Sequence, residues 1–238
     1  MNEKIKAILF ESNDVLVRPV TGHWFIPPNF FQFIKSVNYE HVRNIEREAA
    51  FAQASEQLVF YPLVRTMEEE YNAFVEYYRM FFMSIPRLKA TPEQVEGIAR
   101  DLVYNPEKCE FLPDAMEVIQ VLASRCKLAV VAEGWPSLED VFTHAGMRHQ
   151  FSAFVISRQS GQSMPNPCLF QVALDELGVS SQNALYVDDS SQNCDAARRM
   201  GFQTAILCRD GAEYVISRLI NRNHRVIRSL TDLPALIA

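Results

Sequence analysis

The chain begins with a short apolar run that passes directly into a polar turn. Residues 6–10 are mostly apolar and β-prone, and Glu11, Ser12, Asn13 and Asp14 follow without a break. A buried strand that ends in this way presents those polar side chains at its carboxyl end, which is where ligands bind in open α/β sheets. This stretch therefore predicts a central strand and the position of a functional crevice beside it.

Strand and helix patterns alternate from residue 111 to the C-terminus. The expected strands lie at residues 127–132, 154–156, 184–187, 204–207 and 226–227. The expected helices between and after them lie at residues 114–124, 137–146, 167–177 and 193–200, with a last short helix near Leu233. Strands that alternate with helices of about ten residues predict βαβ units and a parallel sheet with helices on both faces.

Residues 18–110 have a different character, because strand-like runs give way to aromatic-rich helical patterns. Helices are expected over residues 41–58 and 67–83, and after Thr91, where Pro92 and Gln94 complete a capping sequence. The aromatic stripe within the second of these helices favours a bundle core over a ligand box. The predicted organisation is an α/β core made of residues 1–17 and 111–238, with an inserted α-helical domain at 18–110.

Composition narrows the classes of partner. The net charge of −6 over 238 residues disfavours a general nucleic-acid or anionic-membrane surface. The five cysteines are scattered, which fits a reducing compartment and neither a disulfide framework nor a zinc site. No run of about 18 apolar residues occurs, and the N-terminus lacks the pattern of a signal peptide. We therefore expect a cytoplasmic protein that binds no nucleic acid and no membrane.

The parallel arrangement brings several polar strand ends to one edge of the sheet. Carboxylates gathered in one crevice repel one another, so some must take up protons or a hard cation must lie between them. A ligand set made only of oxygens favours Mg²⁺. The alternative is that Asp14 and Glu133 point into water and only Asp188 and Asp189 matter. The residues concerned are Glu11, Asn13, Asp14, Glu133, Asp188 and Asp189.

Four short motifs and a helix opening occur in a characteristic order, and they resemble those of the haloacid dehalogenase (HAD) superfamily of Mg²⁺-dependent hydrolases. The first to fourth motifs are the segments 10–16, 131–134, 161–167 and 187–193, and the helix opening is at 112–114. The resemblance covers nearly the whole chain, and the helical insert after the first motif is similar to the family's C1-type cap. It implies a doubly wound parallel-sheet core with an inserted α-helical cap, a Mg²⁺ cofactor and phosphoryl transfer through an aspartyl-phosphate.

The motifs depart from the family pattern at four positions that carry chemistry. Glu11 stands where the family has its nucleophilic Asp, and Asn13 stands where it has the Asp that acts as general acid and base. Ala132 replaces a hydroxyl that binds the phosphoryl group, and Met164 replaces a Lys that neutralises it. Only the metal-binding aspartates of the fourth motif match. The resemblance thus implies a weakened Mg²⁺ site made of Glu11, Asn13, Asp188 and Asp189.

Three hypotheses follow. The favoured one is a catalytically impaired or inactive family member kept for binding or scaffolding. The alternative is a divergent Mg²⁺-dependent phosphohydrolase that acts on a small phosphorylated metabolite, with Glu11 as nucleophile or metal ligand and Asp14 as acid and base. A third is a cation-dependent binder of small molecules.

Arg158 could replace the positive charge of the family Lys, and the alternative is that it is a solvated loop residue. His23 is interpreted as incidental. Expected partners are a small phosphorylated metabolite or a protein, for a monomer or homodimer.

Overall fold

The computed structural model describes residues 4–237, and the chain divides into two compact units. The α/β unit comprises the described residues within Met1–Arg18, Phe111–Gly134 and Phe142–Ala238, and the helical unit comprises Pro19–Glu110 and Trp135–Val141. The sequence expectation placed residues 135–141 in the α/β core, because they directly follow a strand of its sheet. In the structure this short segment belongs to the helical unit, where the Trp135 ring packs against Phe74 with 4.8 Å between their centroids.

The α/β unit is built on a six-stranded sheet, and every pair of neighbouring strands in it is parallel. The strand order is β5-β4-β1-β6-β7-β8. The order in which successive strands are added reverses at β1, since β4 and β5 lie on one side of β1 and β6 to β8 lie on the other. The strands are β1 (Ala7–Phe10), β4 (Lys127–Ala132), β5 (Ala153–Ile156), β6 (Ala184–Asp188), β7 (Gln203–Leu207) and β8 (Arg225–Ile227).

The register of the central strands aligns their carboxyl ends. Phe10 pairs with Val130 of β4 and with Val187 of β6. The loops that leave β1, β4 and β6 therefore meet at one edge of the sheet, at the point where the strand order reverses. That position is the usual ligand site of a doubly wound sheet, and it is where the sequence predicted the crevice.

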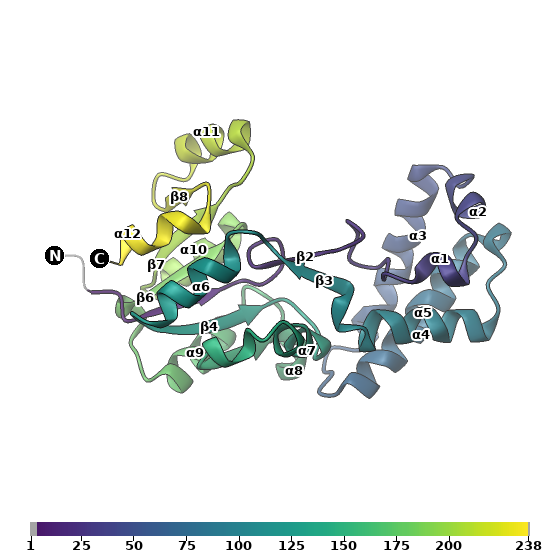
Figure 1. Cartoon of the computed structure of the whole chain (residues 1–238), viewed down its shortest axis with the longest axis horizontal. Helices are drawn as coiled ribbons and strands as arrows, with labels where there is room; N and C mark the ends of the chain where they lie inside the picture. Colours follow the sequence, from purple (N-terminus) through teal and green to yellow (C-terminus); the bar gives the residue numbers. More distant parts are fainter. Residues whose placement is uncertain (1–3, 238) are drawn as a thin grey trace. The chain divides into compact units, whose positions relative to one another are not determined.

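Helices cover both faces of this sheet, as Figure 1 shows. On one face α9 and α10 pack on β4 to β7, together with Ala7 and Leu9. Ile8 and Phe10 point to the other face and are fully buried, and α6 packs there on β4. The helices of the unit are α6 (Ala115–Ala123), α8 (Ser157–Ser160), α9 (Pro167–Leu177), α10 (Ser191–Arg199), α11 (Gly211–Ile220) and α12 (Leu233–Leu236), and α7 (Ser137–His144) begins in the helical unit. The α/β fold class with an inserted helical region is confirmed.

The helical unit packs around one long helix. The helix α4 packs against both α3 and α5. The predicted capping box at Thr91 is present, and a second one, which was not predicted, occurs at Thr66. The aromatic stripe packs inward: Tyr78 and Phe81 are fully buried, and the Phe81 ring stacks on Phe51 at 4.4 Å. The core interpretation of the stripe is confirmed. The helices are α1 (Phe30–Phe33), α2 (Ser36–Glu40), α3 (Asn44–Gln57), α4 (Met67–Ser84) and α5 (Pro92–Tyr104).

Several elements were not predicted from the sequence. The chain enters and leaves the inserted region through a two-stranded sheet of β2 (Val17–Pro19) and β3 (Cys109–Phe111). The helix α11 was not among the expected helices, and in the structure its large apolar residues are exposed, with Ile216 58% and Ile220 73% exposed. Within residues 4–237, no helix combines the length and hydrophobicity that a membrane crossing would require.

Candidate functional site

The loop after β1 holds a carboxylate that is bound entirely by main-chain groups. Glu11 is only 5% exposed. Its Oε1 accepts hydrogen bonds from the N–H groups of Ser12 (2.7 Å) and Asn13 (3.3 Å), and its Oε2 accepts one from the N–H of Glu133 (3.1 Å). Both oxygens of the residue at the nucleophile position are therefore engaged inside the protein.

The surroundings of Glu11 favour its neutral form. Burial raises the pKa of its carboxyl group, and the negative charge of Asp188 raises it further. The three main-chain N–H groups lower the pKa but do not compensate, so it lies well above its ordinary value.

The rest of the first turn is shaped by its backbone. Asn13 donates from Nδ2 to the main-chain oxygen of Glu133 at 2.8 Å. Asp14 is exposed and left-handed, with φ of 58°, and its N–H donates to the oxygen of Val17 at 2.8 Å. The left-handed region is disfavoured for residues other than glycine, although Asp tolerates it better than most. The turn therefore places Asp14 at the surface while Asn13 bonds to the neighbouring loop.

Glu133 connects three loops of the site, and sequence reasoning had treated it only as one of several strand-end carboxylates. Its N–H binds Glu11 and its carbonyl oxygen accepts from Asn13, while its Oε2 accepts a hydrogen bond from the N–H of Met164 at 2.8 Å. The preceding residue, Ala132, is fully buried and offers no donor from its side chain. The signal that could have identified Glu133 is its place directly after the last residue of β4.

The other candidate residues have different surroundings. Met164 is half-buried and packs against the apolar core beneath α9. The main-chain N–H of Arg158 lies 3.4 Å from the oxygen of Gly134, so the backbone at Arg158 borders the loop after β4. His23 lies in the helical unit, where its ring packs on Phe51 with 4.3 Å between centroids.

The loop after β6 carries the two aspartates of the fourth motif. Asp188 is fully buried, and its Oδ1 accepts from the N–H of Ser190 at 2.8 Å. Its Oδ2 accepts from Asn193 Nδ2 at 2.9 Å and from the hydroxyl of Tyr186. Asp189 is exposed at the edge of this loop. Partial desolvation of its carboxyl group, followed by its hydrogen bond and charge interaction with Asp188, raises its pKa to about 6.

The donor set does not fit a Mg²⁺ ion as it stands. Glu11 and Asp188 already use both carboxylate oxygens as acceptors for protein donors. Within the part of the chain that the structure describes, residues 4–237, no three or more His, Cys, Asp or Glu side chains are arranged to hold a metal ion. The expected set of Glu11, Asn13, Asp188 and Asp189 would have to rearrange before it could coordinate Mg²⁺ with several oxygens.

A second hydrogen-bond network, centred on Asp114, supports the turn after β1. Asp114 accepts two hydrogen bonds from Arg209, at 2.9 and 3.0 Å, and others from Ser229 Oγ and the N–H of Leu230. Arg209 in turn donates to the oxygen of Val15 at 3.2 Å. Burial raises the pKa of Asp114, but these hydrogen bonds outweigh it and lower the pKa overall. The network ties the turn after β1 to the C-terminal part of the chain.

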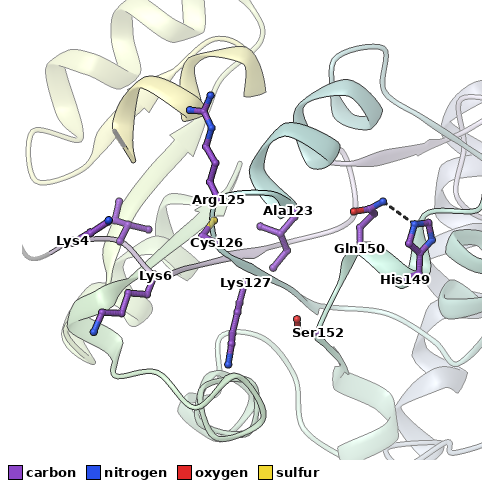
Figure 2. Close-up of a pocket in the computed structure, with 11 residues that line it drawn as sticks. Lys4, Lys6, Ala123, Arg125, Cys126, Lys127, His149, Gln150 and Ser152 are labelled. Atoms are coloured by element: carbon purple, nitrogen blue, oxygen red, sulfur yellow. Dashed lines mark hydrogen bonds between the residues drawn. The ribbon is translucent and has the colours of Figure 1, made fainter.

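A pocket of about 610 Å³ lies at the opposite, amino-terminal edge of the sheet. Figure 2 shows that its basic side chains diverge, because Arg125 and Lys127 point to opposite sides. Lys127 donates from Nζ to the oxygen of Leu177 at 2.6 Å. Side chains that diverge do not form a binding site for a single anion, so the carboxyl edge remains the candidate site.

Comparison with known proteins gives a consistent family. The model of the family described as "Haloacid dehalogenase-like hydrolase" matches residues 39–207. A glyceraldehyde 3-phosphate phosphatase of Methanopyrus kandleri is 29% identical over 213 residues, which are 84% of this chain and 82% of that protein. A phosphoserine phosphatase of Thermus thermophilus is 28% identical over 116 residues, 48% of this chain and only about half (47%) of that protein.

Solved structures show the same fold at lower identity. A HAD phosphatase from Thermococcus onnurineus superposes with a TM-score of 0.64 at 21% identity over 98% of each chain. An L-2-haloacid dehalogenase from Xanthobacter autotrophicus gives a TM-score of 0.63 at 18% identity, again over 98% of each chain. At this identity the likeness establishes the fold alone.

Proposed function

Since the chain belongs to the haloacid dehalogenase-like hydrolase family, we propose that it is a catalytically impaired member retained for a binding or scaffolding role. The observation that carries the proposal is the state of Glu11. Its carboxylate is buried, and all three of its hydrogen bonds come from main-chain N–H groups. Nucleophilic attack needs an ionised oxygen that is free to approach the substrate, and this carboxylate has none so placed.

The other motif positions add to this deficit. Asn13 cannot transfer a proton as an acid or base, and its amide is bonded to Glu133. Ala132 supplies no hydroxyl and Met164 supplies no positive charge. Loss of one preorganised electrostatic contact typically lowers the rate by about 10²–10³, and the losses need not add. Together they support an activity far below that of an intact family member.

Electrostatics also disfavour tight binding of a phosphate ester at this edge. The phosphate would meet Asp188 and Asp189, while Met164 provides no charge to neutralise it. Like charges at close range repel, and a cation would be needed to hold them together. The proposal therefore favours a protein partner over a small phosphorylated metabolite for the retained role.

A phosphatase screen tests the proposal. Wild type and Asp189→Ala are assayed with Mg²⁺ on a panel of phosphomonoesters that includes glyceraldehyde 3-phosphate and phosphoserine. We expect no turnover above background, and any turnover that persists in Asp189→Ala is assigned to a contaminant. Turnover that Asp189→Ala abolishes, and that Glu11→Gln also abolishes, would refute the proposal. It would establish the divergent phosphohydrolase that uses Glu11.

A further inference from the structure

The helix α11 of the α/β unit presents its apolar side chains to solvent and polar ones to the fold. Ser217, in the second half of the helix, is buried, and Asn221 donates from Nδ2 to its hydroxyl oxygen at 2.9 Å. A surface helix normally buries its apolar face, so this arrangement is the reverse of the usual one. Four large aliphatic side chains are 58–73% exposed, and we call them the α11 face: Val215, Ile216, Leu219 and Ile220.

The α11 face belongs to a well-formed helix. Its members are spaced at i, i+1, i+4 and i+5, which places them on one side of the helix. Asp210 caps the helix by accepting hydrogen bonds from the N–H groups of Ala212 at 2.8 Å and Glu213 at 2.9 Å. Figure 1 shows α11 next to β8, the edge strand of the sheet, on which it packs. Contiguous exposed apolar surface on such a helix marks an interaction site.

Two arginines border one edge of the α11 face. Arg218 and Arg222 are exposed and lie one turn apart on the same side of the helix. They follow Val215 and Leu219 by three residues each, so they lie beside these two side chains. The guanidinium of Arg218 lies over the Tyr214 ring, 5.6 Å from its centroid. Within residues 4–237, no ion pair involves Arg218 or Arg222, so both charges can be neutralised by a partner.

The opposite edge of the α11 face carries the opposite charge. Glu213 is exposed and precedes Ile216 by three residues. A bilayer would cover both edges at once, and an anionic bilayer would repel Glu213. A second copy is disfavoured as well, because antiparallel pairing of two α11 helices about a two-fold axis sets Arg218 and Arg222 against the same residues of the other copy. The charges therefore favour a segment of a different protein.

We propose that the α11 face binds an amphipathic helix of a partner protein. The partner helix packs apolar side chains on the face and places carboxylates beside Arg218 and Arg222. A helix laid on an apolar surface is a recurring mode of recognition, and its anchors are spaced at i, i+3, i+4 and i+7. Charges at the edge of such a contact select the partner and fix its register. The inference names a surface and a class of partner for the binding role proposed above, and it rests on that role.

A displayed library of amphipathic helical peptides, selected on the whole chain, tests the proposal. The library keeps an apolar face constant and varies the edge positions among Glu, Gln and Lys. Wild type should enrich Glu along one edge. The selected peptide should bind at least roughly tenfold more tightly than the same peptide with Lys at those positions. Combining Arg218→Glu with Arg222→Glu should reverse this preference.

Matched variants separate the α11 face from exposed residues elsewhere. Leu219→Gln should weaken binding of the selected peptide at least roughly tenfold, whereas Val172→Gln, at an exposed position of α9, should not. Arg100→Glu changes an exposed arginine that also lies over a tyrosine ring, 5.2 Å from the centroid of Tyr71, and should leave the preference for Glu intact. Because these side chains are exposed, the variants should remain folded.

Several results would overturn the proposal. They include the absence of any enriched peptide and equal enrichment of Glu, Gln and Lys. Dimerisation of wild type that Leu219→Gln abolishes would assign the α11 face to a second copy. Binding to phosphatidylserine vesicles that Leu219→Gln abolishes would assign it to a lipid surface. A failed selection leaves the phosphatase result unchanged, and turnover in the phosphatase screen leaves the selected peptide bound, so the two proposals can fail separately.

Discussion

The carboxylate of Glu133 accepts a hydrogen bond from the main-chain N–H of Met164, with 2.8 Å between the oxygen and the nitrogen. This bond joins the loop after β4 to the segment that carries the third motif. The two loops are therefore joined by a bond between a glutamate side chain and a main-chain N–H.

Replacing Glu133 by Ala should loosen this connection. Hydrogen bonds that involve a charged group contribute about 1.5–3 kcal/mol, and the N–H of Met164 would lose its partner. We expect the free energy of unfolding, measured by urea titration, to fall by about 1–3 kcal/mol. Glu176→Ala, an exposed glutamate on α9, should change it by less than about 0.5 kcal/mol. Equal effects of the two substitutions would show that the bond to Met164 contributes nothing.

Removing the charge of Asp114 should lower the free energy of unfolding by an amount that depends on pH. The pKa of Asp114 is lowered in the folded state. Its stabilising contribution is therefore complete above the unfolded pKa of about 3.9 and is lost as the pH falls through the folded pKa. Asp114→Asn should cost about 1–3 kcal/mol at pH 7, since it disturbs the hydrogen bonds from Arg209 and Ser229.

The measurement for Asp114→Asn is a series of urea titrations from neutral to acid pH. The difference from wild type should be full at pH 7 and shrink below about pH 4. Asp175→Asn, at an exposed position of α9, is the control and should follow wild type throughout. A difference that stays constant with pH would mean that the carboxylate charge of Asp114 is not what stabilises the network.

We expect the family residues to restore phosphatase activity only if Glu133, whose side chain binds the N–H of Met164, is replaced as well. We expect little Mg²⁺-dependent phosphatase activity from the combined Glu11→Asp, Asn13→Asp, Ala132→Ser and Met164→Lys variant. Adding Glu133→Asn should raise kcat/KM by a further factor of about 10² or more. The same variant should show a Mg²⁺-dependent rise in Tm that wild type lacks.

The control for this series is Asp189→Ala added to the variant with five substitutions, which should abolish both the activity and the Mg²⁺-dependent rise in Tm. If the variant with four substitutions is already as active as the one with five, Glu133 does not obstruct the site. If wild type shows the same rise in Tm with Mg²⁺ as the restored protein, the existing donors can coordinate the ion after rearranging.

The aromatic core of the helical unit should dominate the stability of that unit. Phe81 is fully buried, whereas Phe60 is 76% exposed in the same unit. Phe81→Ala should therefore lower the free energy of unfolding by about 3–5 kcal/mol. Phe60→Ala should change it by less than about 0.5 kcal/mol. Similar losses in the two variants would contradict the packing of the stripe into this core.

The sheet could be predicted well because its signals are local. The continuous apolar run of β4 matches Lys127–Ala132, and Pro167 and Gly178 bound α9 as expected. These signals depend on backbone preferences and on burial, which the residue types carry in themselves. By contrast, α11 was not predicted, and the sequence could not show that its apolar residues Val215 and Leu219 would be exposed, because exposure depends on what the helix packs against in the fold.

The location of the site could be predicted from the sequence, but its hydrogen bonds could not. Parallel register brings the ends of β1, β4 and β6 to one edge, so Glu11, Glu133 and Asp188 were expected near one another. Residue types do not show that Glu11 curls back onto Ser12 and Asn13, or that Glu133 reaches Met164. Those choices depend on rotamers and on main-chain directions that become fixed only when the loops pack together.

The four crossings of the chain between its two units limit how this protein can be recombined. An insert with two crossings can be excised or transplanted as a cassette, leaving a closed loop behind. Here, deletion of residues 19–110 would strand Trp135–Val141 without the α4 residues that cover it, Phe74 and Glu70. A chimera that exchanges this insert must therefore carry the 135–141 segment with it.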